Sequence, residues 1–173
     1  MIQIHYYKSP LGVLILGDYQ GKLCMADWQY RKMRNAIDQR IKNFFQTDFI
    51  EALSPLHQET IKQLEAYFQK ERKTFNLPIV FAGTDFQVKV WEQLLQIPYG
   101  NTLSYLQLSK ILGNEKTIRA VATANGANAL SIIVPCHRVI GSNGELTSYA
   151  GGLTAKRKLL DIESRHPITT LFD

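Results

Sequence analysis

The sequence has few cysteines and no long hydrophobic run, and each absence excludes a class of protein. Only two cysteines, Cys24 and Cys136, occur among 173 residues, too few for a disulfide-stapled secreted scaffold. The longest uncharged apolar stretches, Val13–Leu16 and Ile132–Val134, are far shorter than the ~20 residues of a membrane-spanning helix. The first residues show no cationic segment followed by an apolar core. We therefore expect a cytoplasmic protein that makes no contact with a membrane.

A set of metal ligands is also missing. A structural zinc site needs about four convergent Cys, His or carboxylate ligands. Besides the Cys136-His137 pair, the other cysteine and histidines stand at no ligand spacing, namely Cys24, His5, His57 and His166. The sequence therefore predicts no bound metal.

The overall composition is that of a folded globular protein. Hydrophobic residues make up 45% and charged residues 20% of the chain, close to the average for soluble domains. This length allows one ordinary domain or two small ones. Lys and Arg number 20 against 15 Asp and Glu, which gives a net charge of +5. A basic excess of this size favours a polyanionic partner.

The N-terminal half contains three strand candidates separated by turn sequences. Ile2–Tyr7, Gly12–Leu16 and Lys22–Trp28 are rich in β-branched and aromatic residues, and short turns between them favour an antiparallel meander. A polar helix is expected over Tyr30–Phe45. The segment Thr74–Phe81 contains a proline and is at best an edge strand.

A second helix is expected to begin at Ser54-Pro55, because Ser is a favoured N-cap and Pro is favoured at the first helical position. Its apolar side chains form an amphipathic stripe. They are Leu56, Ile61, Leu64, Tyr67 and Phe68.

The pattern changes near Ala82-Gly83, from strands with polar helices to a series of short, capped helices. We place a domain boundary there, which gives an N-terminal domain of residues 1–83 and a C-terminal domain of residues 84–173. Capping boxes at Thr84-x-x-Gln87 and Ser104-x-x-Gln107 predict two helix starts.

The helix that begins at Ser104 should end at Gly113, and another should run from Asn114 to about Asn125. Two helices joined by a short glycine-containing turn form a candidate helix-turn-helix. The second helix carries one basic group, Arg119, among small side chains, which suits close approach to a minor groove. A buried helix packed against its neighbour is the alternative. The small residues are Ala120, Ala122, Ala124 and Ala127.

The candidate chemical site is the dipeptide Cys136-His137. A nearby imidazole lowers the pKa of a thiol and so activates it as a nucleophile; the alternative is a buried structural cysteine. Adjacent side chains of an extended segment point to opposite faces, so we expect a water molecule to link the two groups. An acid must orient the imidazole, and the expected helix Leu153–Glu163 offers Asp161 and Glu163, between which periodicity does not decide.

The motifs of residues 84–173 together resemble those of the O6-alkylguanine-DNA alkyltransferases, the methylated-DNA–protein-cysteine methyltransferases. The N-terminal part, with its Ser9–Gly12 turn, resembles the family's ribonuclease H-like domain in layout. The resemblance implies an α+β fold, with a three-stranded antiparallel sheet and helices before a mainly helical domain that contains the helix-turn-helix. The matching motifs are Ile97–Gly100, Ser104-Tyr105, Arg119–Val121, Asn128, Pro135–Val139, Gly144, Tyr149–Gly152, and Lys156, Leu159, Leu160 and Glu163 on the last helix.

The resemblance implies DNA repair by direct reversal. Double-stranded DNA containing O6-alkylguanine would be the partner, with O4-methylthymine as a further substrate, and no obligate protein partner is implied. The damaged base would be flipped out, and its alkyl group transferred irreversibly to Cys136 in a single turnover. His137 would act on Cys136 through a water, and Glu163 would complete the relay. No metal or organic cofactor is implied.

The resemblance also assigns residues to substrate and DNA. Tyr105 would approach the minor-groove edge of the guanine and help it leave, and Asn128 would hold the turn before the active-site segment. Tyr149 would line the pocket. Arg119 would fill the gap in the duplex, while the small residues of its helix approach the minor groove.

Backbone groups would read the damaged base. The carbonyls of Cys136 and Val139 would accept from the guanine amino group, and the amide of Ala150 would donate to the alkylated oxygen. The family often has Ser at the position of Ala150 and Gly at that of Ser148, so Ala150 keeps the backbone amide but lacks the serine hydroxyl group.

Two other classes of protein fit parts of the pattern. Alkyltransferase-like proteins bind alkylated DNA without repairing it, but they replace the acceptor cysteine, which is present here. A cysteine hydrolase or thiol oxidoreductase would need a deacylating water or a resolving cysteine near Cys136, and Cys24 lies in a different predicted domain.

Overall fold

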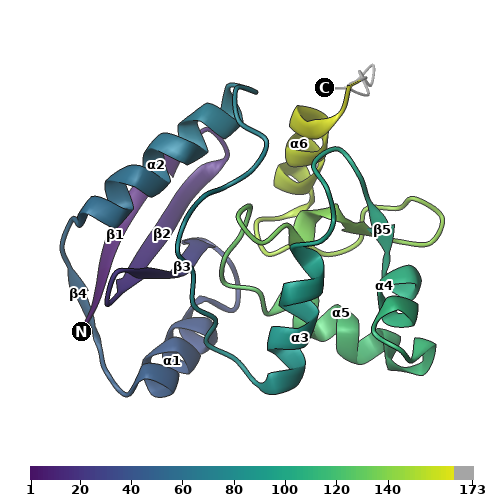
Figure 1. Ribbon diagram of the computed structural model, residues 1–173, viewed down its shortest axis with the longest axis horizontal. Coiled ribbons are helices and arrows are strands. Elements are labelled where there is room, and N and C mark those ends of the chain that lie inside the picture. Colours follow the sequence, from purple (N-terminus) through teal and green to yellow (C-terminus); the bar gives the residue numbers. More distant parts are fainter. Residues whose placement is uncertain (166–173) are drawn as a thin grey trace.

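The computed structural model describes residues 1–165 and begins with a four-stranded sheet in the order β3-β2-β1-β4 (Figure 1). The first three strands form the expected antiparallel meander, and β4 adds a parallel edge strand beside β1. The elements of this half are β1 (Ile2–Ser9), β2 (Gly12–Tyr19), β3 (Lys22–Trp28), α1 (Arg34–Phe45), β4 (Phe49–Glu51) and α2 (Pro55–Phe68).

Three details of this half differ from the sequence prediction. The first helix begins at Arg34, because residues 29–33 form turns rather than a helical start. The short strand β4 was not predicted, since it is only three residues long. The segment over 74–81 is not a strand: it makes an isolated bridge from Ile79 to Leu23. The N-cap of α2 is as predicted, with Ser54 accepting from the amide of His57.

The C-terminal half consists mainly of short helices (Figure 1). The capping boxes of Thr84 and Ser104 are both present and begin α3 and α4. Gly113, with a φ of 99°, follows α4, and the next helix begins as a 3-10 turn before it becomes α-helical. The elements are α3 (Asp85–Leu94), β5 (Leu103–Ser104), α4 (Tyr105–Ile111), η1 (Glu115–Thr117), α5 (Ile118–Gly126), η2 (Cys136–Arg138), β6 (Val139–Ile140) and α6 (Leu153–Glu163).

One hydrophobic core joins the two halves. It contains the fully buried side chains of Trp28 and Tyr67 together with Trp91 of α3. The segment before Cys136 also attaches to β3, because the amide of Ala26 donates to the carbonyl of Ala129 at 2.8 Å, next to the isolated bridge between Ala26 and Leu130. The predicted α+β fold class is confirmed, and the core connects the sheet directly to the active-site segment.

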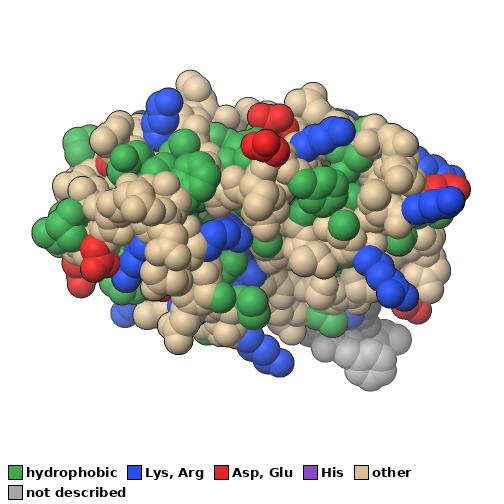
Figure 2. Space-filling model, turned by 90° about the horizontal axis from the view of Figure 1, so that it is seen from below, with side chains coloured by type: hydrophobic (Ala, Val, Ile, Leu, Met, Phe, Trp, Pro, Cys, Tyr) green, Lys and Arg blue, Asp and Glu red, His purple; other side chains and the backbone are tan. Residues whose placement is uncertain are grey.

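Within residues 1–165, no helix is long and apolar enough to cross a bilayer. On the face shown in Figure 2, Lys and Arg side chains are scattered among polar and apolar groups rather than gathered into one patch. The basic excess is therefore spread over this face.

Candidate active site

A tight turn carries the chain from α5 to Cys136. The side chain of Asn128 spans this turn: its Nδ2 donates to the carbonyl of Val134 at 2.9 Å, and its Oδ1 accepts from the amide of Leu130 at 3.0 Å. Ile132 within the turn has a φ of 73°, a strained value for a β-branched residue. The buried Asn128 thus holds a strained segment in place immediately before the thiol.

Cys136 and His137 lie in a single 3-10 turn, η2, so the expectation of an extended segment was wrong. The backbone curls because the amide of Arg138 bonds back to the carbonyl of Pro135 at 3.0 Å. His137 is fully buried, and its Nε2 lies 2.7 Å from Oε1 of Glu163. Its Nδ1 is buried and makes no hydrogen bond within residues 1–165.

Glu163, rather than Asp161, is the acid that meets the imidazole. Its carboxylate also accepts two hydrogen bonds from Arg138, from Nε at 2.8 Å and from Nη2 at 2.9 Å. Tyr67 of α2 donates a further one at 2.7 Å. Burial alone would raise the pKa of Glu163, but His137 and Arg138 lower it from 4.5 to about 2. The carboxylate is therefore ionised throughout the neutral range.

The thiol and the imidazole are both neutral in this state. Burial raises the pKa of Cys136, although Asn128 and Lys156 act in the opposite direction. Burial also lowers the pKa of His137, against the effect of Glu163. Burial thus outweighs the groups that favour the thiolate, because desolvation disfavours both charged forms.

Lys156 is a buried cation beside this pair, and sequence reasoning gave it no role beyond its place in the resemblance. Its Nζ donates to the carbonyl of Val139 at 2.6 Å and to that of Ser148 at 3.3 Å. The carbonyl of Val139, predicted to read the substrate, therefore already accepts one hydrogen bond. A carbonyl oxygen has two lone pairs, so one acceptor site is left.

The segment that carries Tyr149 packs against the end of β3 and the turn after it. Trp28 Nε1 donates to Tyr149 Oη at 3.2 Å, and Tyr30 Oη donates to the carbonyl of Gly151 at 2.8 Å. A Cβ at Gly151 would lie 2.7 Å from Trp28 and 2.9 Å from Tyr149, so only glycine fits between them. Ala150, next to Gly151, is partly exposed. The N-terminal half thus shapes the segment on which Tyr149 and Ala150 stand.

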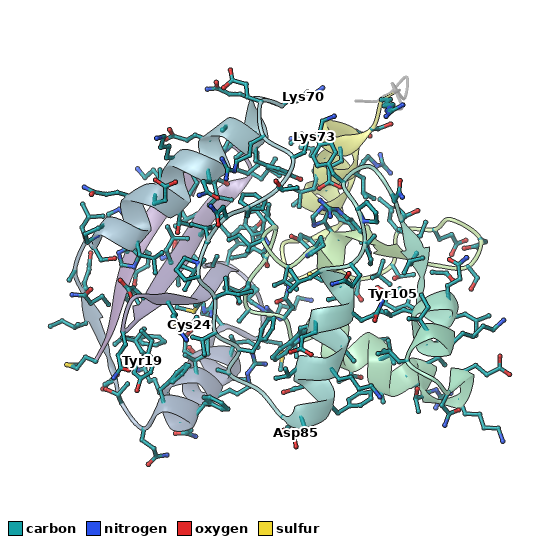
Figure 3. All side chains as sticks on the ribbon, in the orientation of Figure 1. Tyr19, Cys24, Lys70, Lys73, Asp85 and Tyr105 are labelled. Carbon is teal, nitrogen blue, oxygen red and sulfur yellow. The ribbon has the colours of Figure 1, made fainter. Side chains whose placement is uncertain are left out.

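Tyr105 is the first residue of α4 and is partly exposed (Figure 3). Its Oη accepts from Thr147 Oγ1 at 3.2 Å, and Lys156 Nζ lies 5.9 Å from the centre of its ring. Tyr105 therefore borders the same loop that carries Tyr149.

The helix α5, the second of the candidate helix-turn-helix, presents only part of its predicted surface. Arg119 and Ala120 are exposed, and Ala122 and Ala127 are partly exposed. Ala124 is buried, with 2% of its surface exposed. Its side chain packs against the core, so it is not part of the exposed face of this helix.

Arginines of the N-terminal half hold the end of α5. Arg31 donates to the carbonyl of Gly126 at 2.8 Å and to that of Asn128 at 3.2 Å, and Arg40 donates to that of Ala127 at 2.9 Å. Cations near a helix C-terminus stabilise its unpaired carbonyl groups. Sequence reasoning missed these contacts, which connect segments about 90 residues apart and leave no local signal.

No group of three or more His, Cys, Asp or Glu side chains that could hold a metal ion occurs in the part of the chain that the structure describes. His166, considered above as a possible ligand, lies outside the described residues.

Comparisons with known proteins give the same fold and the same family. A family model described as the ribonuclease-like domain of 6-O-methylguanine DNA methyltransferase matches residues 2–81, and one described as its DNA binding domain matches residues 85–165. The methylated-DNA–protein-cysteine methyltransferase of Mycobacterium leprae is 41% identical over the full length of both chains. That of Methanosarcina acetivorans is 41% identical over 91% of this chain and 95% of its own.

Solved structures agree with these sequence matches. The O6-methylguanine methyltransferase of Mycobacterium tuberculosis has a TM-score of 0.80 at 37% identity and covers both chains completely. A structure of the same organism's OGT in complex with DNA has a TM-score of 0.81 at 37% identity, over 99% of each chain. The fold is thus that of a DNA-binding alkyl-transfer protein. The chain belongs to the methylated-DNA–protein-cysteine methyltransferase family.

Proposed function

We propose that the protein repairs O6-methylguanine in double-stranded DNA by moving the methyl group irreversibly to Sγ of Cys136. The observation that carries this proposal is the buried contact of 2.7 Å between His137 Nε2 and Glu163 Oε1. His137 directly follows the buried Cys136 in the chain. A carboxylate only accepts hydrogen bonds, so it fixes the proton of the imidazole on Nε2. This leaves Nδ1 with the lone pair that a base needs.

In the proposed reaction, the proton of the Cys136 thiol passes through a water molecule to His137 Nδ1. The thiolate then attacks the methyl carbon, a carbon–sulfur bond forms, and the bond from that carbon to the guanine oxygen breaks. The electron pair of the broken bond stays on guanine. Guanine then takes up one proton, which balances the proton that the thiol gave to His137. Tyr105 helps guanine to leave by donating from the minor-groove side.

Burial favours this sequence of events. A thiol with a raised pKa gives a strongly nucleophilic thiolate once it is deprotonated, and the Glu163 carboxylate offsets the charge that develops on His137. The product is a neutral thioether, which offers no leaving group to water or to a second thiol. The protein therefore reacts once.

The base has to leave the duplex to reach a thiol as buried as Cys136, because enzymes that act on a stacked base extrude it. Arg119, exposed on α5, would occupy the place of the flipped guanine, while Ala120, Ala122 and Ala127 face the minor groove. The carbonyls of Cys136 and Val139 and the amide of Ala150 would read the base, with Tyr149 as the pocket wall. The same site would accept O4-methylthymine.

The test is the intact mass of the protein after exposure to a duplex oligonucleotide with one O6-methylguanine. We expect one methyl group per protein molecule, and peptide mapping should place it on Cys136. A Cys24→Ala variant is the matched control and should react normally. Several turnovers per protein molecule, or a methyl group on Cys24, would overturn the proposal.

A further inference from the structure

A tyrosine of the N-terminal half reaches the proposed relay. Tyr67 lies in the last turn of α2, and α2 and α6 run to the same side of the molecule (Figure 1). Its Oη is 2.7 Å from Glu163 Oε1, the oxygen that also faces His137 Nε2. The residues of this contact are 96 positions apart in the chain. The sequence pattern around Tyr67 indicated only the apolar stripe of a helix.

The hydroxyl group of Tyr67 acts as a donor in this contact. Burial, and after it the neighbouring Glu163, raises the pKa of Tyr67 well above its ordinary value, so the phenol keeps its proton. The ring is fixed as well: it is fully buried and packs against Phe68, Phe75 and Tyr99 at centroid distances of 5.5, 5.6 and 6.3 Å. A rigid donor thus points at one oxygen of a carboxylate.

We infer that Tyr67 is a positioning residue of the alkyl-transfer site, through which the N-terminal domain sets the orientation and basicity of Glu163 and hence the base strength of His137. This inference rests on the proposed function. Arg138 holds the carboxylate through both oxygens, yet Tyr67 and His137 share Oε1. A hydrogen bond to that oxygen withdraws negative charge from the contact with the imidazole.

The change Tyr67→Phe removes only the hydroxyl group and keeps the ring packing. We expect single-turnover methyl transfer to slow about tenfold, because a carboxylate that has lost this donor is held less firmly against His137. Tenfold corresponds to ~1.4 kcal/mol and is close to the net value of a hydrogen bond to a charged group. Without the donor, Oε1 carries more charge and stabilises the imidazolium. The acid limb of the rate profile should therefore move to higher pH, since His137 accepts a proton only while it is neutral.

Other groups around the relay stay in place in this variant, so the shift in pH profile reports Tyr67 alone. Among residues 1–165, the other charged and titratable groups that interact with His137 or Glu163 are Arg138 of η2, Lys156 of α6, Tyr149 of the loop before α6, and Tyr99 after α3. Cys136 precedes His137 in η2.

Tyr99→Phe is the matched control. Tyr99 packs against Tyr67, but its hydroxyl donates to the carbonyl of Ile162 at 3.0 Å rather than to the carboxylate. The control loses one hydroxyl group of the same kind, and its pH profile should overlay that of the unmodified protein.

A second test adds Tyr67→Phe to Glu163→Gln. If Tyr67 acts through Glu163, the double variant should be no slower than Glu163→Gln alone.

The outcomes separate the two proposals. An unmodified protein that takes up no methyl group would overturn the proposed function and this inference together. If it reacts, and Tyr67→Phe reacts at the same rate with the same pH profile, only the inference fails. The inference also fails if the two losses add in the double variant, because Tyr67 would then act through the fold and not through Glu163.

Discussion

Replacing Glu163 by glutamine tests the centre of the site. The carboxylate accepts hydrogen bonds from His137, Tyr67 and, twice, from Arg138. An amide of the same shape has a single acceptor oxygen and two N–H donors. In Glu163→Gln, at least one donor must therefore face another donor, and Arg138 loses its buried counter-charge.

The structure sets the size of the effect on stability. The pKa of Glu163 falls from 4.5 to about 2, and each unit of such a shift corresponds to about 1.4 kcal/mol, so ionised Glu163 contributes about 3 kcal/mol. Because the folded-state pKa is the lower one, this stabilisation is complete above pH ~4.5 and is lost as the pH falls towards 2. We expect Glu163→Gln to lower the free energy of unfolding by about 3–5 kcal/mol at pH 7, the usual cost of breaking a buried ion pair.

The effect on rate has a different origin. Without a carboxylate, nothing offsets the charge that His137 acquires, and His137 must share the single amide oxygen with Tyr67 and Arg138. Methyl transfer should therefore slow by about 100-fold or more, the range for a positioned general base. Single-turnover transfer from a methylated duplex, measured against pH, gives this rate, and urea unfolding at pH 7 and pH 3 gives the stability. The gap in unfolding free energy between Glu163→Gln and the unmodified protein should narrow at pH 3.

Asp161→Asn is the control, because Asp161 lies on the same helix and makes no contact with His137 within the described residues. It should leave the rate unchanged. If Glu163→Gln has a rate profile that overlays that of the unmodified protein, Glu163 is only a structural residue of α6, and the relay proposed here is refuted.

Three further predictions address the nucleophile, the DNA contact and the pocket. Cys136→Ala should abolish methyl transfer while binding to duplex DNA, measured by fluorescence anisotropy, persists; loss of both would point to a structural role. Arg119→Ala should slow repair in duplex DNA far more than reaction with free O6-benzylguanine, which needs no flipping, and equal losses would rule out the role in the base stack. Gly151→Ala places a Cβ 2.7 Å from Trp28 and 2.9 Å from Tyr149, so it should slow reaction even with the free base; an unchanged rate would show that the pocket wall yields.

Local signals in the sequence were sufficient for much of the fold. The capping boxes at Thr84 and Ser104 mark helix starts through contacts over three residues, and the meander follows from alternation and turn residues. The helix Leu153–Glu163 has the predicted bounds. In each case the chemistry that fixes the element lies within a few residues of it.

Features that depend on distant partners were not predicted. The three-residue strand β4 forms by pairing with the edge of β1. The turn η2 is a different case, because a local hydrogen bond curls it where an extended segment was expected. Arg31 at the end of α5 and Tyr67 at Glu163 each act on a group about 100 residues away. Nothing in the sequence on either side of Arg31 or Tyr67 distinguishes these side chains from an ordinary surface arginine or core tyrosine.

If the protein reacts once, as we propose, burial of the thiol has a further consequence. An exposed, low-pKa thiolate reacts with any soft electrophile or oxidant it meets, and such a reaction would consume the molecule before it reached DNA. Here desolvation keeps Cys136 protonated at rest, while Glu163 stays ionised and holds the imidazole ready to accept the proton. On the proposed mechanism, Cys136 is thus a protected nucleophile beside a preorganised base, and a flipped base brings the electrophile to both.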